Sequence, residues 1–197
     1  MGWVTEIGLI GTLRVAFLAF FLLPGATFAQ EGISRFDQFE ILENELVWRN
    51  TYVCPGDIDS VRHRVVQMLK SKFFTFNVIR NEAGYNGELH HYKVDCKKYD
   101  RNYMNTPRMY WDGEWTGKFI VVLNKGSYQV SVYALYYEKM GQSSGYYRTE
   151  KPIKGRYLDA VTSKNKLSFR KNELANLSLM GASLRDDFDV KNTTPLR

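Results

Sequence analysis

One segment constrains the fold of this 197-residue chain more than any other. The apolar run KFIVVL ends in the tetrapeptide NKGS, and residues of alternating character follow from Tyr128 to Tyr137. Gly126 tolerates the positive φ of a tight turn, and alternation with a period of two is typical of a strand with one buried face. We therefore expect an antiparallel hairpin of residues 118–123 and 128–137, and hence a fold built on a sheet.

Three further strands and one helix are predicted before this hairpin. Residues 46–54 alternate between two faces and end at the tripeptide PGD, where the carboxylate of Asp57 is placed to cap a helix. Apolar residues then recur every three or four positions, which predicts an amphipathic helix over 58–72. Strands over 74–78 and from about 85 to 99 follow, separated by the turn sequence NEAG.

The remaining segments are expected to complete the same domain. Residues 30–44 are polar and are interpreted as a lead-in segment, residues 45–140 as the core of sheet and helix, and residues 141–197 as a loop followed by a helix near 170–183. This order of elements predicts an α+β fold: a mostly antiparallel sheet of four to five strands with two helices packed on one face.

The first 29 residues are predicted to be a signal peptide. Arg14 precedes the apolar core VAFLAFFLL, Pro24 follows it, and Thr27 and Ala29 are the small residues expected before a cleavage site. We expect cleavage before Gln30 and export to the periplasm or another part of the cell envelope, with membrane contact only during export. An uncleaved anchor is the alternative, but Arg14 interrupts the run before it reaches the roughly 20 apolar residues that span a bilayer.

Export changes the interpretation of the two cysteines, Cys54 and Cys96. In an oxidising compartment an even number of cysteines indicates a disulfide, which would close a long loop here. Two buried free thiols are the alternative, because sequence spacing does not establish that the two Cα atoms come within bonding distance.

The segment from Lys98 to Trp115 is rich in aromatic and cationic side chains. Pro107 and Gly113 exclude one continuous helix, and a long loop inside a compact domain is usually functional or disordered. Aromatic rings with cationic neighbours can stack on sugars or contact apolar groups of a protein partner. The alternative is that the rings fold back as a lid over one end of the core. The candidate binding residues are Tyr99, Arg101, Tyr103, Arg108, Tyr110, Trp111 and Trp115.

An ordered set of features runs from Val47 to Tyr137: the helix over 57–72, the sequence FNVIRNEAGYNGE, and the hairpin WTGKFIVVLNKGSYQVSVYAL. In this order the features resemble a family of exported Bacteroidota proteins of unknown function that have a TATA-binding-protein-like (TBP-like) fold. The resemblance implies a curved antiparallel sheet with helices on its covered face and a location in the cell envelope. Since the family has no established activity, the resemblance implies no functional residues.

The sequence carries no signature of catalysis or metal binding. Its cysteines and histidines form neither a C-x-x-C nor an H-E-x-x-H motif, and the adjacent His90 and His91 point to opposite faces of the predicted strand. Asp186, Asp187 and Asp189 lack the glycine and glutamate positions of a calcium-binding loop. We therefore expect no metal and no cofactor.

The formal net charge of +6 bears on the partners of the chain. Without a run of three Lys or Arg, and in an exported protein, this excess does not indicate nucleic-acid binding, so we expect no nucleic-acid partner. We expect a non-enzymatic binding domain that uses its sheet edge and the 98–115 loop to contact an envelope protein or glycan. Two alternatives stay open: a hydrolase of envelope glycans or peptides with Asp112 and Glu114 as acid and base, and a structural spacer in an envelope assembly.

Overall fold

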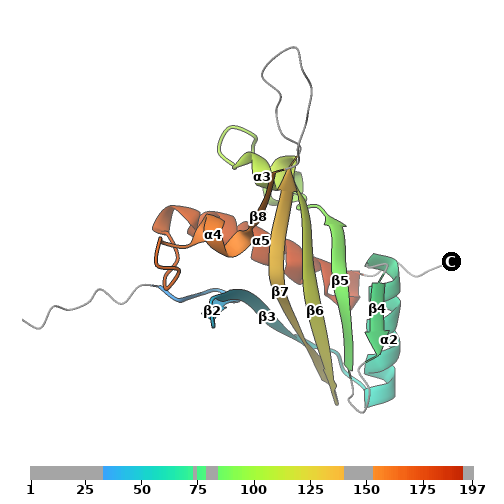
Figure 1. Ribbon diagram of the computed structural model, residues 1–197. Helices are drawn as coiled ribbons and strands as arrows, with labels where there is room; N and C mark the ends of the chain where they lie inside the picture. Colours follow the sequence, from blue (N-terminus) through green and yellow to red (C-terminus); the bar gives the residue numbers. More distant parts are fainter. Residues whose placement is uncertain (1–32, 73–74, 79–83, 140–152, 193–197) are drawn as a thin grey trace, which may run out of the picture. The chain divides into compact units, whose positions relative to one another are not determined.

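An eight-stranded antiparallel sheet forms the framework of the computed structural model (Figure 1). The structure describes residues 33–72, 75–78, 84–139 and 153–192. The predicted signal peptide and its cleavage site before Gln30 lie outside the described residues.

The strands follow the order β1-β2-β3-β7-β6-β5-β4, and β8 pairs with the far end of β7. The long strand β7 can hold two partners on one edge because β3 pairs with its first half and β8 with its last four residues. The strands are β1 (Arg35–Phe36), β2 (Phe39–Leu42), β3 (Glu45–Val53), β4 (Thr75–Val78), β5 (Gly84–Tyr92), β6 (Glu114–Asn124), β7 (Ser127–Lys139) and β8 (Ile153–Arg156).

The predicted hairpin is confirmed as β6 and β7, which pair antiparallel from Asn124↔Ser127 along most of their length. Gly126 takes the positive φ of 75° that the turn requires. The predicted mostly antiparallel α+β sheet is likewise confirmed, although it has more strands than the four to five expected.

The helix predicted over 58–72 is confirmed as α2 (Ile58–Lys72). The backbone N–H of Ser60 donates to the side chain of Asp57 at 2.8 Å, so Asp57 satisfies one of the free amides of the first turn. Val61, Val65, Met68 and Leu69 are buried, as their spacing predicts. The other helices are α3 (Arg108–Trp111), α4 (Tyr157–Val161), α5 (Leu174–Asp187) and the 3₁₀-helices η1 (Lys97–Tyr99), η2 (Lys171–Glu173) and η3 (Val190–Asn192).

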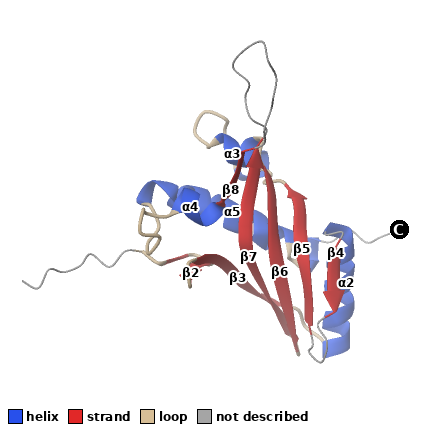
Figure 2. Ribbon diagram, viewed as in Figure 1, coloured by secondary structure: helices blue, strands red, loops and turns tan. Residues whose placement is uncertain are grey.

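One face of the sheet carries the core. Paired residues on neighbouring strands point to the same side, and Trp48, Val132 and Phe119 form such a buried row across β3, β7 and β6. The α5 helix crosses behind these strands (Figure 2), and the ring of Phe188 contacts both Trp48 and Phe119.

The opposite face, which we call the open face, carries polar and charged side chains together with exposed valines, Val53 and Val122. Arg49 and Thr51 of β3, Gln129 of β7 and Lys118 of β6 point to this side and are exposed or half-buried. Alternation along each strand therefore divides the sheet into a buried apolar side and an accessible side of mixed character.

Two irregularities in pairing bend the sheet near the start of β6. The register shifts between Leu89 and Tyr92 of β5, where His91 has a φ of 52°, and again opposite Ala134 of β7, which has a φ of 51°. Bulges of this kind bend a strand and increase its twist. They give the sheet the curvature that the sequence resemblance implies.

Several predicted boundaries are wrong. The strand expected from 85 to 99 ends at Tyr92, because the bulge at His91 turns the chain and the side chain of Asp95 accepts a hydrogen bond from the N–H of Lys98 at the start of η1. The lead-in segment 30–44 contains β1 and β2, which pair with each other and with β3. Four α-helices, rather than two, lie in the described part of the chain, and the C-terminal helix begins and ends four residues later than expected.

Of the two alternatives for Cys54 and Cys96, the structure has the second: no disulfide joins them, and both are buried free thiols. The N–H of Cys54 donates to Gly126 O beside the β6–β7 turn, whereas the thiol of Cys96 donates to Tyr110 O near the start of β6. The 11 residues of β6 separate these places. At about 3.4 Å per residue the separation is on the order of 30 Å, far beyond the roughly 7 Å that a disulfide allows.

Among the described residues, no helix is both long enough and apolar enough to cross a membrane.

Candidate functional site

The 98–115 loop connects β5 to β6 at the end of the sheet opposite the β6–β7 turn, and α3 lies within it (Figure 1). The structure divides its aromatic residues into two groups. One group is packed into the protein at the base of the loop, and the other is exposed at its tip.

Tyr110 and Trp115 belong to the base and are almost completely buried, with exposed fractions of 1% and 0%. Their ring centroids are 5.5 Å apart, and each ring also contacts the ring of Tyr157 at the start of α4, at 6.1 and 5.0 Å. These two candidates are therefore core residues and are not available to a partner.

Two more candidates, Tyr99 and Arg101, fasten the base of the loop to α5. The single proton of the Tyr99 hydroxyl is shared between two acceptors, the carboxylate of Asp186 at 2.9 Å and the carbonyl of Ala182 at 3.1 Å. The guanidinium of Arg101 donates to the carbonyl of Ala175 at 2.8 Å. Both side chains hold the loop in place.

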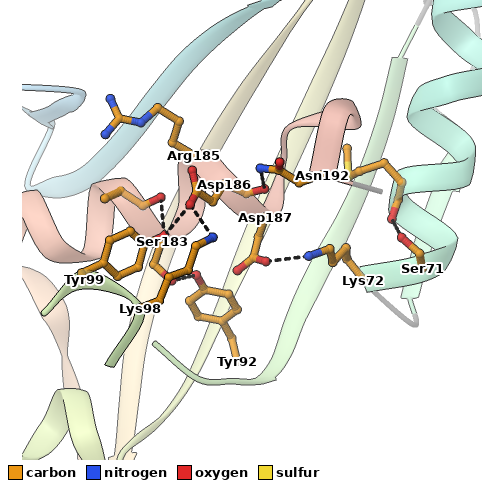
Figure 3. A network of polar contacts seen from close by, with 12 residues as sticks. Ser71, Lys72, Tyr92, Lys98, Tyr99, Ser183, Arg185, Asp186, Asp187 and Asn192 are labelled. Atoms are coloured by element: carbon orange, nitrogen blue, oxygen red, sulfur yellow. Dashed lines mark hydrogen bonds and ion pairs between the residues drawn. The ribbon is translucent and has the colours of Figure 1, made fainter. Parts of the chain in front are cut away.

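The contact of Tyr99 is part of a polar network between the loop, α5 and α2 (Figure 3). Lys98 forms an ion pair with Asp186 at 2.5 Å, and Lys72 of α2 pairs with Asp187 at 3.0 Å. Partial burial acts to raise the pKa of Asp186, but hydrogen bonds from Lys98 and Tyr99 outweigh it and lower that pKa. The pairing stabilises the charged forms of Lys98 and Asp186, and together with the Lys72–Asp187 pair it acts as a structural clamp.

The tip of the loop consists of Tyr103, Met104, Arg108 and Trp111. Met104 is 90% exposed and Tyr103 is 47% exposed, while Trp111 is half-buried. The Tyr103 ring meets the Trp111 ring edge to face at 5.9 Å, and the guanidinium of Arg108 lies 5.7 Å from the centre of the Tyr103 ring. The tip is thus an ordered cluster of aromatic, cationic and thioether groups on the surface.

The structure therefore brings together three of the predicted candidates, Tyr103, Arg108 and Trp111, and assigns the other four to the base. It adds Met104, which sequence analysis missed. The signal for Met104 was weak: it is a single apolar residue inside the turn from Asn102 to Asn105, with no helical or strand period that could bury it.

The carboxylates proposed for a hydrolase do not have the properties of an acid and base pair. Glu114 accepts hydrogen bonds from His91 at 2.5 Å and from Lys93 at 3.0 Å, and these contacts lower its pKa. A general acid needs a raised pKa so that it is protonated at neutral pH. The surroundings of Glu114 favour the ionised form, and Asp112 is exposed.

In the part of the chain that the structure describes, no group of three His, Cys, Asp or Glu side chains comes close enough together to hold a metal ion. The acidic residues Asp186 and Asp187 instead pair with lysines.

Comparison with known proteins finds similarity in structure only. No protein family and no curated protein sequence matches the chain. Two solved structures that match are a TBP-like protein from Parabacteroides distasonis, with a TM-score of 0.45, and a DUF4468 family protein from Bacteroides ovatus, with a TM-score of 0.44. Each match has 11% sequence identity and covers 80% of this chain, and 100% and 92% of the respective neighbour.

Proposed function

We propose that this chain is an exported, non-enzymatic binding domain of the bacterial cell envelope that contacts an envelope protein or glycan through the tip of its 98–115 loop. The observation that supports this proposal most directly is the exposure of Met104 and Tyr103 on a loop whose base is part of the core.

The composition of the tip supports a role in binding. Tyrosine, tryptophan and arginine are the residue types that contribute most often to the binding energy of interfaces, and methionine adapts to irregular apolar surfaces.

The anchored base supports the same role. Because Tyr110, Trp115, Tyr99 and Arg101 already fix the loop, binding at the tip would require little further ordering of the backbone. Preorganisation of this kind increases affinity by reducing the entropy lost on association.

Export is the second part of the proposal, and it rests on the pattern of Arg14, the apolar core and Ala29. It is tested by fractionating producing cells and sequencing the N-terminus of the accumulated protein. We expect an envelope protein that begins at Gln30. A full-length chain in the cytoplasm would contradict the proposal.

The binding role is tested by photocrosslinking in cells that produce the protein. A photoreactive amino acid replaces Met104 at the loop tip or, as a control, Leu167. Leu167 is a suitable control because it is also an exposed apolar residue, at 69%, on a different loop. In parallel, the purified protein is sedimented with peptidoglycan and mixed with lipopolysaccharide. We expect adducts or co-sedimentation that depend on the tip.

Substitution separates specific from nonspecific contact. In the glycan assays, Tyr103→Ala with Met104→Ala should remove binding, whereas Leu167→Ala should leave it unchanged. In the crosslinking assay, Tyr103→Ala beside the photoreactive residue at position 104 should reduce the adducts. If position 104 reacts with no more material than position 167 and neither glycan binds, the loop tip is not a recognition surface and the spacer alternative is favoured.

A further inference from the structure

A small polar cavity opens beside β3 on the open face of the sheet, away from the loop tip. Its volume is about 290 Å³, and it is bounded by the β1–β2 hairpin, β3 and β7. The side chains that matter for its chemistry are Arg35, Asp37, Glu40, Arg49, Thr51 and Gln129.

Hydrogen bonds and strand pairing fix the backbone around the cavity. The N–H of Arg49 donates to the carbonyl of Gln38 at 2.9 Å, which ties the hairpin turn to β3. Phe39, next in the chain, is fully buried and pairs with Trp48. On the other wall Thr51 and Gln129 are register partners, so their hydroxyl and amide groups lie side by side.

The charges in the cavity are only partly paired. Arg35 and Glu40 form an ion pair at 2.5 Å. Arg49 uses its Nε to reach the hydroxyl of Ser131 at 3.4 Å, which leaves its two terminal NH₂ groups without a partner among the described residues. The carboxylate of Asp37 also has no partner within the described part of the chain. One cation and one anion therefore remain available in the same small space.

We propose that this cavity binds a small zwitterion, a compound that carries both a carboxylate and an ammonium group, such as an amino acid or a dipeptide. The terminal NH₂ groups of Arg49 donate to the ligand carboxylate, since a guanidinium matches a carboxylate in a bidentate manner. Asp37 accepts from the ammonium group, and the Thr51 and Gln129 side chains offer further polar contacts. The volume lies at the lower end of the roughly 300–1,000 Å³ of ligand pockets, so the ligand must be small.

The test measures binding of three related probes to the purified protein by isothermal titration calorimetry and ligand-observed NMR. Glycylglycine carries both charges, N-acetylglycylglycine only the carboxylate, and glycylglycinamide only the ammonium group. Because both protein charges are open to solvent, we expect glycylglycine to bind in the millimolar range, and each blocked probe to bind about ten-fold more weakly.

Two variants test which protein charge contacts which charged group of the ligand. Asp37→Asn keeps the shape of the side chain and suits the φ of 53° at this position. It should weaken glycylglycine binding and remove the preference over the acetylated probe. Arg49→Gln should weaken binding and remove the preference over the amide. Lys118→Gln, which removes a cation from the same open face outside the cavity, should leave all three affinities unchanged.

Circular dichroism and melting temperatures establish that each variant is folded. Absence of saturable glycylglycine binding by the wild-type protein would overturn the proposal. Equal binding of the acetylated probe would also overturn it, because the cavity would then be a simple anion site. Binding that neither Asp37→Asn nor Arg49→Gln changes would place the zwitterion elsewhere on the molecule.

Discussion

The hydroxyl groups of Tyr110 and Tyr157 are hydrogen-bonded to each other at 2.9 Å inside the core. This bond joins α3, in the loop between β5 and β6, to α4, which follows β8. Burial raises the pKa of both hydroxyls, so both stay neutral at any physiological pH. The base of the 98–115 loop is thereby a part of the core, and only the tip is free to meet a partner.

Tyr110→Phe should lower the free energy of unfolding by about 1–3 kcal/mol, because it leaves the buried hydroxyl of Tyr157 without this partner. Tyr157→Phe should have a similar effect. Urea unfolding of both variants and of the double variant completes a double-mutant cycle. We expect the double variant to lose less than the sum of the two single losses, since the second substitution leaves no further hydroxyl unpaired. Additive losses would show that the two hydroxyls do not stabilise each other.

The division of the loop into base and tip predicts that substitutions in the two parts change stability to very different extents. Trp115→Ala should lower the free energy of unfolding by about 3–5 kcal/mol, because it opens a cavity among buried rings. Met104→Ala, at a site that is 90% exposed, should change it by less than about 0.5 kcal/mol. Denaturant titration of each variant measures both values. A loss above about 1 kcal/mol for Met104→Ala would mean that the tip is packed down as a lid.

Elements with a strong local pattern could be predicted from the sequence. The β6–β7 hairpin combines alternation with a glycine at the turn, and α2 combines helical periodicity with an aspartate cap at Asp57. The strands β1, β2 and β8 were missed. Each is two to four residues long, and each forms because a neighbouring strand offers it backbone partners. The equally short β4 was predicted, because it combines alternating apolar residues with the turn sequence NEAG that follows it.

The site was predicted only in part for a related reason. Tyr103 and Tyr110 are the same residue type in the same loop, yet one is 47% exposed and the other 1%. The single turn of α3 and the position of Tyr157, far along the chain, decide which ring is buried. The cavity charges Asp37 and Arg49 form no motif at all, because a hairpin that sequence analysis did not predict brings them together.

The two cysteines lead to a prediction about thiol chemistry. Cys54 and Cys96 are 1% and 2% exposed, so neither should react quickly with a thiol reagent while the protein is folded. Burial also raises the pKa of the Cys96 thiol and so reduces its reactive thiolate form. After denaturation without reductant, we expect two reactive thiols per chain. If no thiol reacts after denaturation, the protein contains a disulfide and the free-thiol structure is wrong.

The ion pair between Lys98 and Asp186 predicts a defined dependence of stability on pH. The pKa of Asp186 is lowered in the folded protein, so the stability that its charge contributes is present above the ordinary aspartate pKa of about 3.9 and is lost as the pH falls through the lowered value. The hydrogen bond to Asp186 raises the pKa of Lys98, whose contribution is present below the ordinary lysine value and is lost only as the pH rises through the raised pKa. The pair should therefore stabilise the protein evenly across neutral pH.

Asp186→Asn tests this dependence by urea unfolding at pH 7, 4 and 2.5. Because the two side chains are 51% and 34% exposed, we expect a loss of less than about 1 kcal/mol at pH 7. The difference from the wild-type protein should shrink as the pH falls through the lowered pKa of Asp186, and at high salt, which screens the pair. Asp112→Asn is the control, since Asp112 is exposed and forms no ion pair among the described residues. A difference that stays constant from pH 7 to 2.5 would mean that Asp186 acts through packing or neutral hydrogen bonds, and that its charge does not fasten the loop to α5.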